Sequence, residues 1–450
     1  MADFRCTVCN YIFHENSEGE FESLPDSWRC PVCNAPLTAF VRVSSTTEDV
    51  GRTVSDVFIS QLAAWGVRYV FGIPGTSTLG LVDALRRNDD IKYIQVRHEA
   101  AAAFMASSYG KLMGQPAVCM AVAGPGASNL VTGLLDAALD RAPVLAVTGQ
   151  VETYRMGTGA TQEIDQHSLF ESFSVYNMTL VSPEETAEIA RESLKHAILE
   201  RGVSHVEVPR DVQSMECTAT VKPMRGMISG SAVTATKHQL RAAADLINKA
   251  ERPVIIAGYG ALEAAERVVE LAERIGAAIV STFRGKGIVD NDHPLYMGCH
   301  GSIGSTAAAE AVRKSDLLIV IGSSFSDLTQ IPPARTLQID IDPLMIARRH
   351  PVEQGLTGRS SLIVPVLHSM VEKKEGESNL GELEEIKGEW LGLLQSEADP
   401  SLRPIRPPYL ISVLNGELDD DAIIALDVGE NCWWFGRNFQ MKSTQRLLFS

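Results

Sequence analysis

Short apolar runs alternate with helical segments from residue 53 onward, and this alternation constrains the fold of the 450-residue chain more than any other feature. Four of the runs have the sequences YVFGIPG, YIQVRHE, PAVCMAVAG and APVLAVTGQ. Runs of this kind are typical of strands that are buried on both faces of a parallel sheet. The alternation therefore predicts an α/β fold, in which doubly wound parallel sheets carry helices on both faces.

The pattern divides the chain into successive units. We expect a first α/β domain over 53–217 and a second, central domain over 233–374. A charged stretch, KKEGESNLGELEEIKGE, follows and is typical of a surface helix and connector. Residues 400–450 then begin a third α/β unit with one helix and two strands. Because an α/β domain cannot close on so few elements, we expect a partner chain or a missing C-terminal part to complete it.

A separate module is expected over 1–43, joined by a polar linker at 44–52. Two CxxC pairs supply four thiolates, from Cys6, Cys9, Cys30 and Cys33. Four thiolates suit a tetrahedral zinc ion or a single iron. About 40 residues bury too little surface to fold alone, so the metal is expected to contribute folding energy.

The segments FRCTVCNYIF and LPDSWRCPVCNAPLTAFVRV resemble a shortened rubredoxin, the family whose iron is held by four cysteines and carries one electron. Asn10 and Asn34 stand where that family usually has glycine after each CxxC pair. A structural zinc ribbon is the alternative, because four thiolates accept either metal.

Charge and hydropathy exclude several classes of partner. The formal net charge of −16 disfavours binding to nucleic acid or to anionic lipid. No apolar run reaches the roughly 18 residues that a membrane helix needs, and we expect no signal peptide. Cysteines arranged as metal ligands are typical of a reducing compartment, so the predicted location is cytoplasmic.

Glu99 is the first candidate for chemistry. It follows a hydrophobic strand and opens a helix of small residues, at the edge where parallel sheets place ligands. Taken alone, a glutamate at a helix start is most often a solvated cap favoured by the helix dipole.

The surrounding motifs are more specific. The segments FGIPG, QVRHEAAAAFMA, GPGASNLVTGLLDA and PVLAVTGQV resemble the pyrimidine-binding domain of thiamine-diphosphate enzymes, in the acetolactate synthase and pyruvate oxidase group. STFRGKGIVDNDHPLYMGCHGSIG and RTLQIDIDP resemble the central domain of that group, particularly of pyruvate oxidases. LDVGENCWWFGRNFQMK resembles the start of its diphosphate-binding domain, so the resemblance runs from about residue 53 to the end.

The resemblance implies that the Glu99 carboxyl group hydrogen-bonds the aminopyrimidine of the cofactor and promotes removal of the proton at C2 of its thiazolium. Gln162 matches a family glutamine near the reacting centre. The remaining cofactor-binding positions implied by the match are Gly72, Pro74, Gly75, Gly124, Pro125 and Gly126.

The family holds Mg²⁺ and the diphosphate through a Gly-Asp-Gly motif, which this sequence lacks. The resemblance implies an active site shared between subunits. We therefore expect a homodimer or homotetramer, or a partner chain that carries the diphosphate-binding domain and its Mg²⁺.

Some members of the group also bind FAD. The match to them implies flavin-facing positions at Gly258, Gly260, Thr282, His300, Gly301 and Asp340. Where those members have arginines, however, this chain has Ser323, Ser324 and Leu328. FAD is therefore an open alternative.

Three functions remain at this point. The first is decarboxylation of a 2-oxo acid, pyruvate foremost, with electrons passed to the rubredoxin-type iron, with or without FAD. The second is carboligation of the acetolactate synthase type, although the lysine expected near residues 175–176 is not evident. The third is a non-catalytic or partner-dependent subunit without its own diphosphate site.

Overall fold

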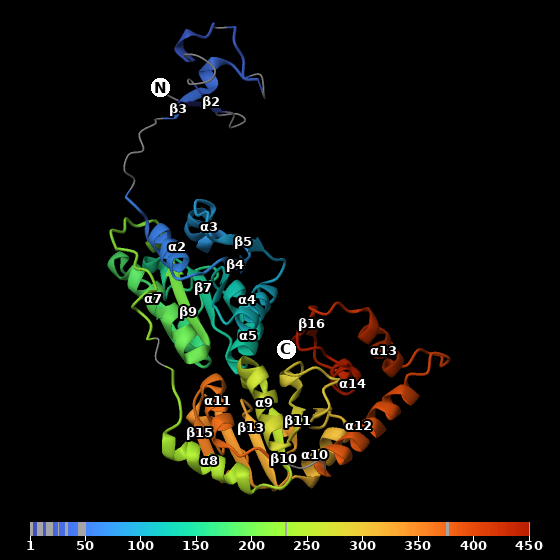
Figure 1. The fold of residues 1–450 in the computed structure, drawn as a ribbon. Helices are drawn as coiled ribbons and strands as arrows, with labels where there is room; N and C mark the ends of the chain where they lie inside the picture. Colours follow the sequence, from blue (N-terminus) through green and yellow to red (C-terminus); the bar gives the residue numbers. More distant parts are fainter. Residues whose placement is uncertain are drawn as a thin grey trace. The chain divides into compact units, whose positions relative to one another are not determined.

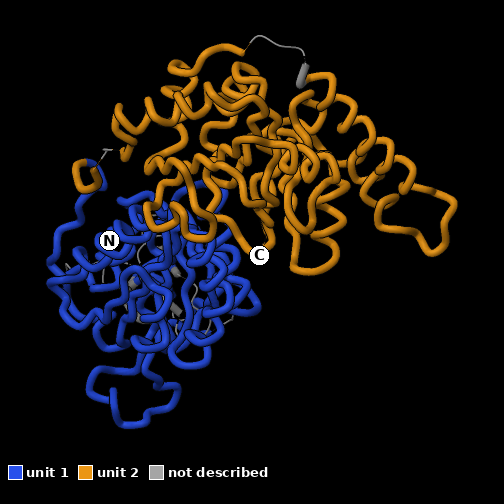
Figure 2. Tube along the Cα trace, turned by 90° about the horizontal axis from the view of Figure 1, so that it is seen from below, with its two compact units in different colours: residues 1–225 blue, residues 226–450 orange. Residues whose placement is uncertain are grey.

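The computed structural model describes residues 3–6, 12–14, 21–25, 27–31, 35–43, 51–229, 232–374 and 378–449. The chain divides into two compact units, residues 1–225 and 226–450 (Figure 2). Each unit contains one six-stranded parallel sheet, and unit 2 adds a small two-stranded sheet (Figure 1). The predicted α/β fold with doubly wound parallel sheets is confirmed.

The N-terminal segment forms a small antiparallel sheet in the order β2-β1-β3. Its strands are β1 (Asp3–Cys6), β2 (Ile12–His14) and β3 (Phe40–Val43). An aromatic cluster supports it, with Phe4 stacked on Phe21 at 4.0 Å between ring centroids and Phe13 edge-on to Trp28 at 5.7 Å. Cys6 ends β1 and Cys30 is buried, whereas Cys9 and Cys33 lie outside the described residues.

The sheet of unit 1 has the order β5-β4-β6-β7-β9-β8, with every pair parallel. Its strands are β4 (Tyr69–Gly72), β5 (Lys92–Gln95), β6 (Ala117–Ala121), β7 (Val144–Gln150), β8 (Ser174–Thr179) and β9 (Val203–Pro209). Helices α4 (Glu99–Met113) and α5 (Pro125–Leu139) pack on one face through an apolar cluster. Figure 1 shows α2 (Val54–Ala64) and α7 (Thr186–His196) on the opposite face.

Small residues let α4 and α5 approach closely. A Cβ atom added to Gly133 of α5 would lie 2.7 Å from the Cβ of Ala103 on α4. The alanine-rich segment after Glu99 therefore serves the packing of two helices, and this packing fixes the direction in which each helix leaves the sheet edge.

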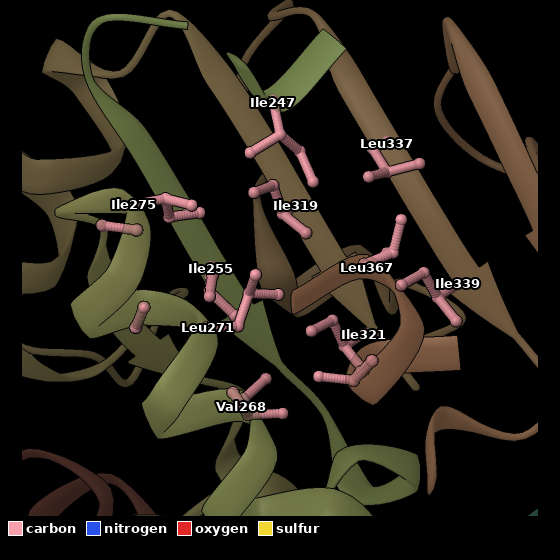
Figure 3. Packing of buried hydrophobic residues seen from close by; sticks show 14 of the residues in the cluster. Ile247, Ile255, Val268, Leu271, Ile275, Ile319, Ile321, Leu337, Ile339 and Leu367 are labelled. Carbon is pink, nitrogen blue, oxygen red and sulfur yellow. The ribbon is translucent and has the colours of Figure 1, made fainter. Parts of the chain in front are cut away.

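The sheet of unit 2 has the order β12-β11-β10-β13-β14-β15, again wholly parallel. Its strands are β10 (Pro253–Ala257), β11 (Ala278–Ser281), β12 (Tyr296–Cys299), β13 (Leu317–Ile321), β14 (Thr336–Asp340) and β15 (Gln354–Thr357). Helices α8 (Lys237–Lys249), α9 (Ala265–Ile275) and α11 (Ser360–Met370) cover one face. Figure 3 shows Ile255 of β10 beside Leu271 of α9, with Ile319 and Leu337 on the neighbouring strands.

The other face of this sheet is covered by α10 (Thr306–Lys314) and α12 (Ser378–Glu397). The end of the charged stretch predicted as a surface helix and connector is therefore part of the central core: Ile386 is buried against the sheet, together with Trp390 and Leu394, which follow the stretch in α12. The abundance of charge around these three side chains hides their helical spacing in the sequence.

The last segment contains α13 (Pro407–Glu417), β16 (Ile423–Leu426), α14 (Glu430–Asn438) and β17 (Arg446–Phe449). The two strands pair in parallel, and Phe435, Phe439 and Met441 form a small core with Phe283 packed against it. In the described part of the chain, none of the helices combines the length and the apolar character needed to cross a bilayer.

Candidate active site at the carboxyl edge of the first sheet

The loops after β4 and β6 meet at the carboxyl edge of the unit 1 sheet, where the strand order reverses and parallel sheets most often bind ligands. The Ser77 hydroxyl accepts a hydrogen bond from the Ala123 amide at 2.9 Å and ties the two loops together. A Cβ atom on Gly75 would lie 2.4 Å from a methyl carbon of Val122. The structure therefore brings the Gly72–Gly75 turn and the Gly124–Gly126 turn side by side.

Glu99 lies at the same edge, as the first residue of α4. His98 caps the helix, because its Nδ1 accepts from the Ala100 amide at 3.1 Å. The half-buried Glu99 carboxylate accepts from Asn129 Nδ2 on α5 at 3.0 Å. Its other oxygen, Oε1, lies 3.4 Å from the position that a Cβ of Gly126 would occupy.

This arrangement fixes the Glu99 carboxylate beside the Gly124–Gly126 turn. The N-terminal end of α4 favours its negative charge, and Asn129 fixes its orientation. The sequence did not single out Asn129, which lies four residues after Pro125 on the facing helix. Only the packing of α4 on α5 brings it to Glu99.

Gln162 lies in the loop between β7 and α6 (Gln166–Glu171). Its side chain is exposed, and its backbone has a φ of 68°, which is rare for a residue other than glycine. Its carbonyl oxygen lies 2.4 Å from the position that a Cβ of Gly124 would occupy, and Gly124 itself has a φ of 68°. The left-handed backbone of Gln162 costs free energy, and residues of this kind occur often at functional sites.

The neighbouring Glu163 organises this loop. Its carboxylate accepts hydrogen bonds from the backbone amides of Gly157, Gly159 (2.9 Å) and Ala160 (3.0 Å). These bonds, the Gly157 amide first, lower the pKa of Glu163. The two glycines and the glutamate in GTGATQE are the only signal of this loop in the sequence.

The positions expected to face a flavin lie in unit 2. There the loops after β10 and β13 meet at the point where the strand order of the second sheet reverses. The Gly260 amide donates to the Gly322 carbonyl at 3.0 Å, and a Cβ on Gly258 would lie 2.3 Å from that same oxygen. A Cβ on Gly301 would lie 2.5 Å from the Leu328 carbonyl oxygen. The space beside these glycines is therefore filled by the chain itself.

The other flavin candidates also serve local structure. Thr282 caps a short helix by accepting from the Gly285 amide at 3.2 Å, and the Asp340 carboxylate accepts from the Asp342 amide at 2.9 Å. Among the described residues, neither buried ring nitrogen of His300 meets a partner at normal hydrogen-bond geometry, although the Gln330 backbone partly offsets the lowering of its pKa by burial. His300 is the position of this set that most favours a ligand, and the rest of the set does not fit a flavin.

Unit 2 also contains a cavity of about 790 Å³, lined by Ser302 and Gly304 after β12, by Arg406, and by Trp433, Trp434 and Arg437 of α14 among others. For metals, the described ranges contain no cluster of three or more His, Cys, Asp or Glu side chains suited to an ion. The predicted four-cysteine site includes two residues outside those ranges, so it stays a prediction.

Comparisons with known proteins agree with the first site. Residues 52–169 match the N-terminal TPP-binding domain of thiamine pyrophosphate enzymes, and residues 240–367 match the central domain of the same enzymes. A Bacillus subtilis protein named as thiamine pyrophosphate-containing, YdaP, is 33% identical over 89% of this chain and 70% of its own length.

Two acetolactate synthase relatives are similarly close. A probable acetolactate synthase large subunit of Methanocaldococcus jannaschii is 36% identical over 88% of this chain and 70% of its own length. The acetolactate synthase isozyme 1 large subunit of Escherichia coli is 31% identical over 90% of this chain and 73% of its own length. With two domain models in the expected order and relatives matched over most of the chain, this protein belongs to the thiamine pyrophosphate enzyme family.

Proposed function

We propose that the chain provides the pyrimidine-binding side of an active site of the acetolactate synthase type. Such a site decarboxylates one 2-oxo acid, pyruvate foremost, and joins the remaining two-carbon unit to a second 2-oxo acid. The observation that carries the proposal is the Glu99 carboxylate, held by Asn129 at 3.0 Å beside the Gly124–Gly126 turn. The acetolactate synthase relatives favour carboligation over oxidation.

Each residue has a distinct task in this proposal. Thiamine diphosphate, when bound, supplies the electron sink for the broken carbon–carboxylate bond. Glu99 holds a proton at the aminopyrimidine nitrogen, which is general acid–base catalysis by a positioned carboxyl group. The turns at Gly75 and Gly126 let the backbone approach the ring closely. Gln162 lies at the rim, where it meets the substrate.

The diphosphate and Mg²⁺ are assigned to a diphosphate-binding domain with a Gly-Asp-Gly motif, which the 450 residues do not contain. A second copy of these residues lacks the motif as well, so the test supplies it on a candidate partner. The name "large subunit" among the relatives is consistent with an assembly of more than one kind of chain.

The test is a reconstitution. The purified chain is given thiamine diphosphate, Mg²⁺ and pyruvate, alone and with a candidate partner that contains Gly-Asp-Gly, and acetolactate and CO₂ are measured. Acetolactate formation that needs both the chain and the cofactor supports the proposal. Cofactor binding without any pyruvate consumption in either mixture would favour the non-catalytic subunit instead.

A second candidate function rests on the four cysteines. Oxidation of a 2-oxo acid to a carboxylic acid and CO₂ consumes one water and releases two protons to solvent and two electrons, which two rubredoxin-type Fe³⁺ centres accept, one each. The buried Cys30 and the aromatic cluster around Trp28 support a metal module of this kind. Pyruvate-dependent bleaching of the iron colour under anaerobic conditions, with acetate as product, would establish this function over carboligation.

A further inference from the structure

A buried carboxylate lies beneath the loop that carries Gln162. Glu207 of β9 is only 2% exposed. It accepts hydrogen bonds from Gln150 Nε2 on β7 at 2.5 Å, from Gln166 Nε2 on α6 at 2.8 Å and from the Thr179 hydroxyl on β8 at 2.8 Å. Three neutral donors from three elements therefore satisfy one buried negative charge, which is costly to bury and implies a specific use.

One of these donors, Gln150, also bonds to the loop that carries Gln162. Gln150 Nε2 also donates to the carbonyl oxygen of Ile164 at 3.1 Å, and Gln150 Oε1 accepts from the Val151 amide at 2.9 Å. A carboxylate only accepts, so Glu207 requires the NH₂ group of Gln150 to face it. The second N–H of that group then points to Ile164, two residues after Gln162.

The loop is thus fixed on both sides of Gln162. On one side, the Glu163 carboxylate accepts hydrogen bonds from the amides of Gly157, Gly159 and Ala160. On the other, the Ile164 carbonyl accepts from Gln150 Nε2 at 3.1 Å and from the Gln166 amide at 3.0 Å. Between the two, Gln162 keeps its strained backbone, with its carbonyl against Gly124.

We infer that Glu207 and Gln150 are positioning residues, which act through the Ile164 carbonyl to hold Gln162 against the Gly124 turn. The inference rests on the proposed function for the claim that Gln162 meets the substrate, and on the described contacts alone for the claim that this relay orders the loop. The two claims are tested by separate measurements.

The chain offers a matched pair of variants. Gln150→Met removes one donor from Glu207 and also removes the bond to Ile164. Thr179→Val is isosteric and removes one donor from the same carboxylate, but Thr179 has no bond to the loop. Gln150→Met also removes the acceptor of the Val151 amide. Because each variant leaves Glu207 with two donors, a role confined to that carboxylate predicts the same result for both.

The first readout needs no activity. In the full chain, Gln150→Met is expected to speed amide hydrogen exchange in residues 156–165 by about tenfold, because the loop loses one or two hydrogen bonds. Trypsin cleavage after the exposed Arg155 is expected to accelerate by a similar factor. Thr179→Val is expected to leave both rates within about twofold of wild type. Equal loop protection in the two variants would overturn the inference.

A second, milder variant covers the case in which Gln150→Met does not fold. Glu207→Gln keeps the side-chain volume but no longer dictates which end of the Gln150 amide faces it. It is expected to speed exchange in the same ten residues. Unchanged protection there, with the variant folded, would also overturn the inference.

The second readout uses the reconstituted enzyme. Gln150→Met is expected to lower kcat about tenfold or more while the apparent affinity for thiamine diphosphate stays near wild type, because the Glu99 contacts are untouched. Loosened exchange with unchanged kcat would reject the catalytic role of Gln162 and keep the relay. Wild-type protein that turns over no 2-oxo acid would reject the proposed function and leave the exchange test standing.

Discussion

At the scale of single residues, the candidate site depends on side chains that have little freedom to change. Asn129 donates a hydrogen bond to Glu99, and the Gln162 carbonyl lies against Gly124 and leaves no room for a Cβ. The first contact orients a carboxylate, and the second requires glycine at the turn. Each contact predicts a substitution whose effect can be separated from a general loss of fold.

Glu99→Gln is expected to lower the rate of C2 proton exchange of bound thiamine diphosphate by at least about 100-fold, the range for loss of a positioned acid–base group. The half-buried side chain keeps its size and one acceptor for Asn129, so the melting temperature should change little. Proton exchange is followed by NMR in the reconstituted assembly. Glu188→Gln, on the exposed face of α7, is the matched control. An unchanged exchange rate would refute the role of Glu99.

Gly124→Ala is expected to destabilise unit 1 by about 1–3 kcal/mol, because alanine is strained at positive φ and its Cβ meets the Gln162 carbonyl. Gly114→Ala is the control for a left-handed glycine in open space, since Gly114 has a φ of 63°, a ψ of 14° and nothing within 4 Å of its added Cβ. Urea unfolding of both variants measures the difference. A loss no larger than that of the control would show that neither the Gly124 backbone nor its contact with Gln162 requires glycine.

At the scale of helices and strands, two buried polar features join the elements of unit 1. Lys111 of α4 bonds Asp136 of α5 at 2.7 Å and Asp140, the residue that follows α5, at 2.6 Å, with only 7% of its side chain exposed. His205 of β9 bonds Thr148 of β7 at 2.8 Å and Asn177 of β8 at 2.7 Å. The first ties the helix pair that carries the Glu99–Asn129 contact, and the second ties the strands beneath the Gln162 loop.

Lys111→Met should cost about 3–5 kcal/mol of stability, because it removes the buried ammonium that both carboxylates contact. Lys195→Met is the control: the Lys195 ammonium lies 3.5 Å from Glu192, and 35% of the side chain is exposed. Its loss is expected to cost about 1 kcal/mol or less. Chemical unfolding of both variants measures the difference. Similar losses would show that the α4–α5 interface does not depend on this ion group.

Burial, with a smaller contribution from His167, lowers the pKa of His205 from 6.5 to about 3. Between pH 6.5 and about 3, His205 is therefore protonated in the unfolded chain and neutral in the folded chain. Stability from this group is complete above pH 6.5 and falls with acidification, by at most about 1.4 kcal/mol per pH unit.

His205→Gln keeps hydrogen-bonding capacity but does not titrate, so the plot of unfolding free energy against pH should flatten between pH 6 and 4. Urea unfolding across that range is the measurement, and His238→Gln on the exposed start of α8 is the control. A slope equal to that of wild type would show that His205 is protonated in the folded state.

At the scale of the whole molecule, the chain combines the first two domains of a thiamine pyrophosphate enzyme with an N-terminal segment that contains four cysteines. The metal of that segment is a prediction from cysteine spacing. It defines an experiment on the whole chain that is independent of catalysis.

Protein produced with iron in the medium should bind one metal ion per chain, and Cys30→Ser should remove most of it, because a tetrahedral site needs all four thiolates. Cys119→Ser is the control, since Cys119 is buried in β6 within the first α/β sheet. Metal analysis and the visible spectrum give the readout and distinguish iron from zinc. Full metal content in the Cys30 variant would contradict the four-cysteine site.

The parts of the molecule differ in how far sequence predicts them. Strands β6, β7, β10 and β13 are predictable because each is a continuous apolar run between breaks. Strand β8 gives no such signal, since its side chains are only partly buried, and the core residues of α12 are hidden among charges. Glu99 and the Gly124–Gly126 turn are predictable because their motifs are local.

By itself, the sequence determined the alternation of strands and helices, the family of the chain and the positions of its candidate carboxyl group and glycine turns. These are short-range patterns, in which neighbours along the chain carry the information. Only the tertiary structure decided that Asn129 bonds to Glu99 and that the Gln162 carbonyl lies against Gly124. It also decided that the loop glycines of the central domain lie against the backbone of neighbouring loops. The link between Gln150 and Glu207 joins residues 57 positions apart. Such contacts depend on strand order and helix packing, which bring together residues that no local motif connects.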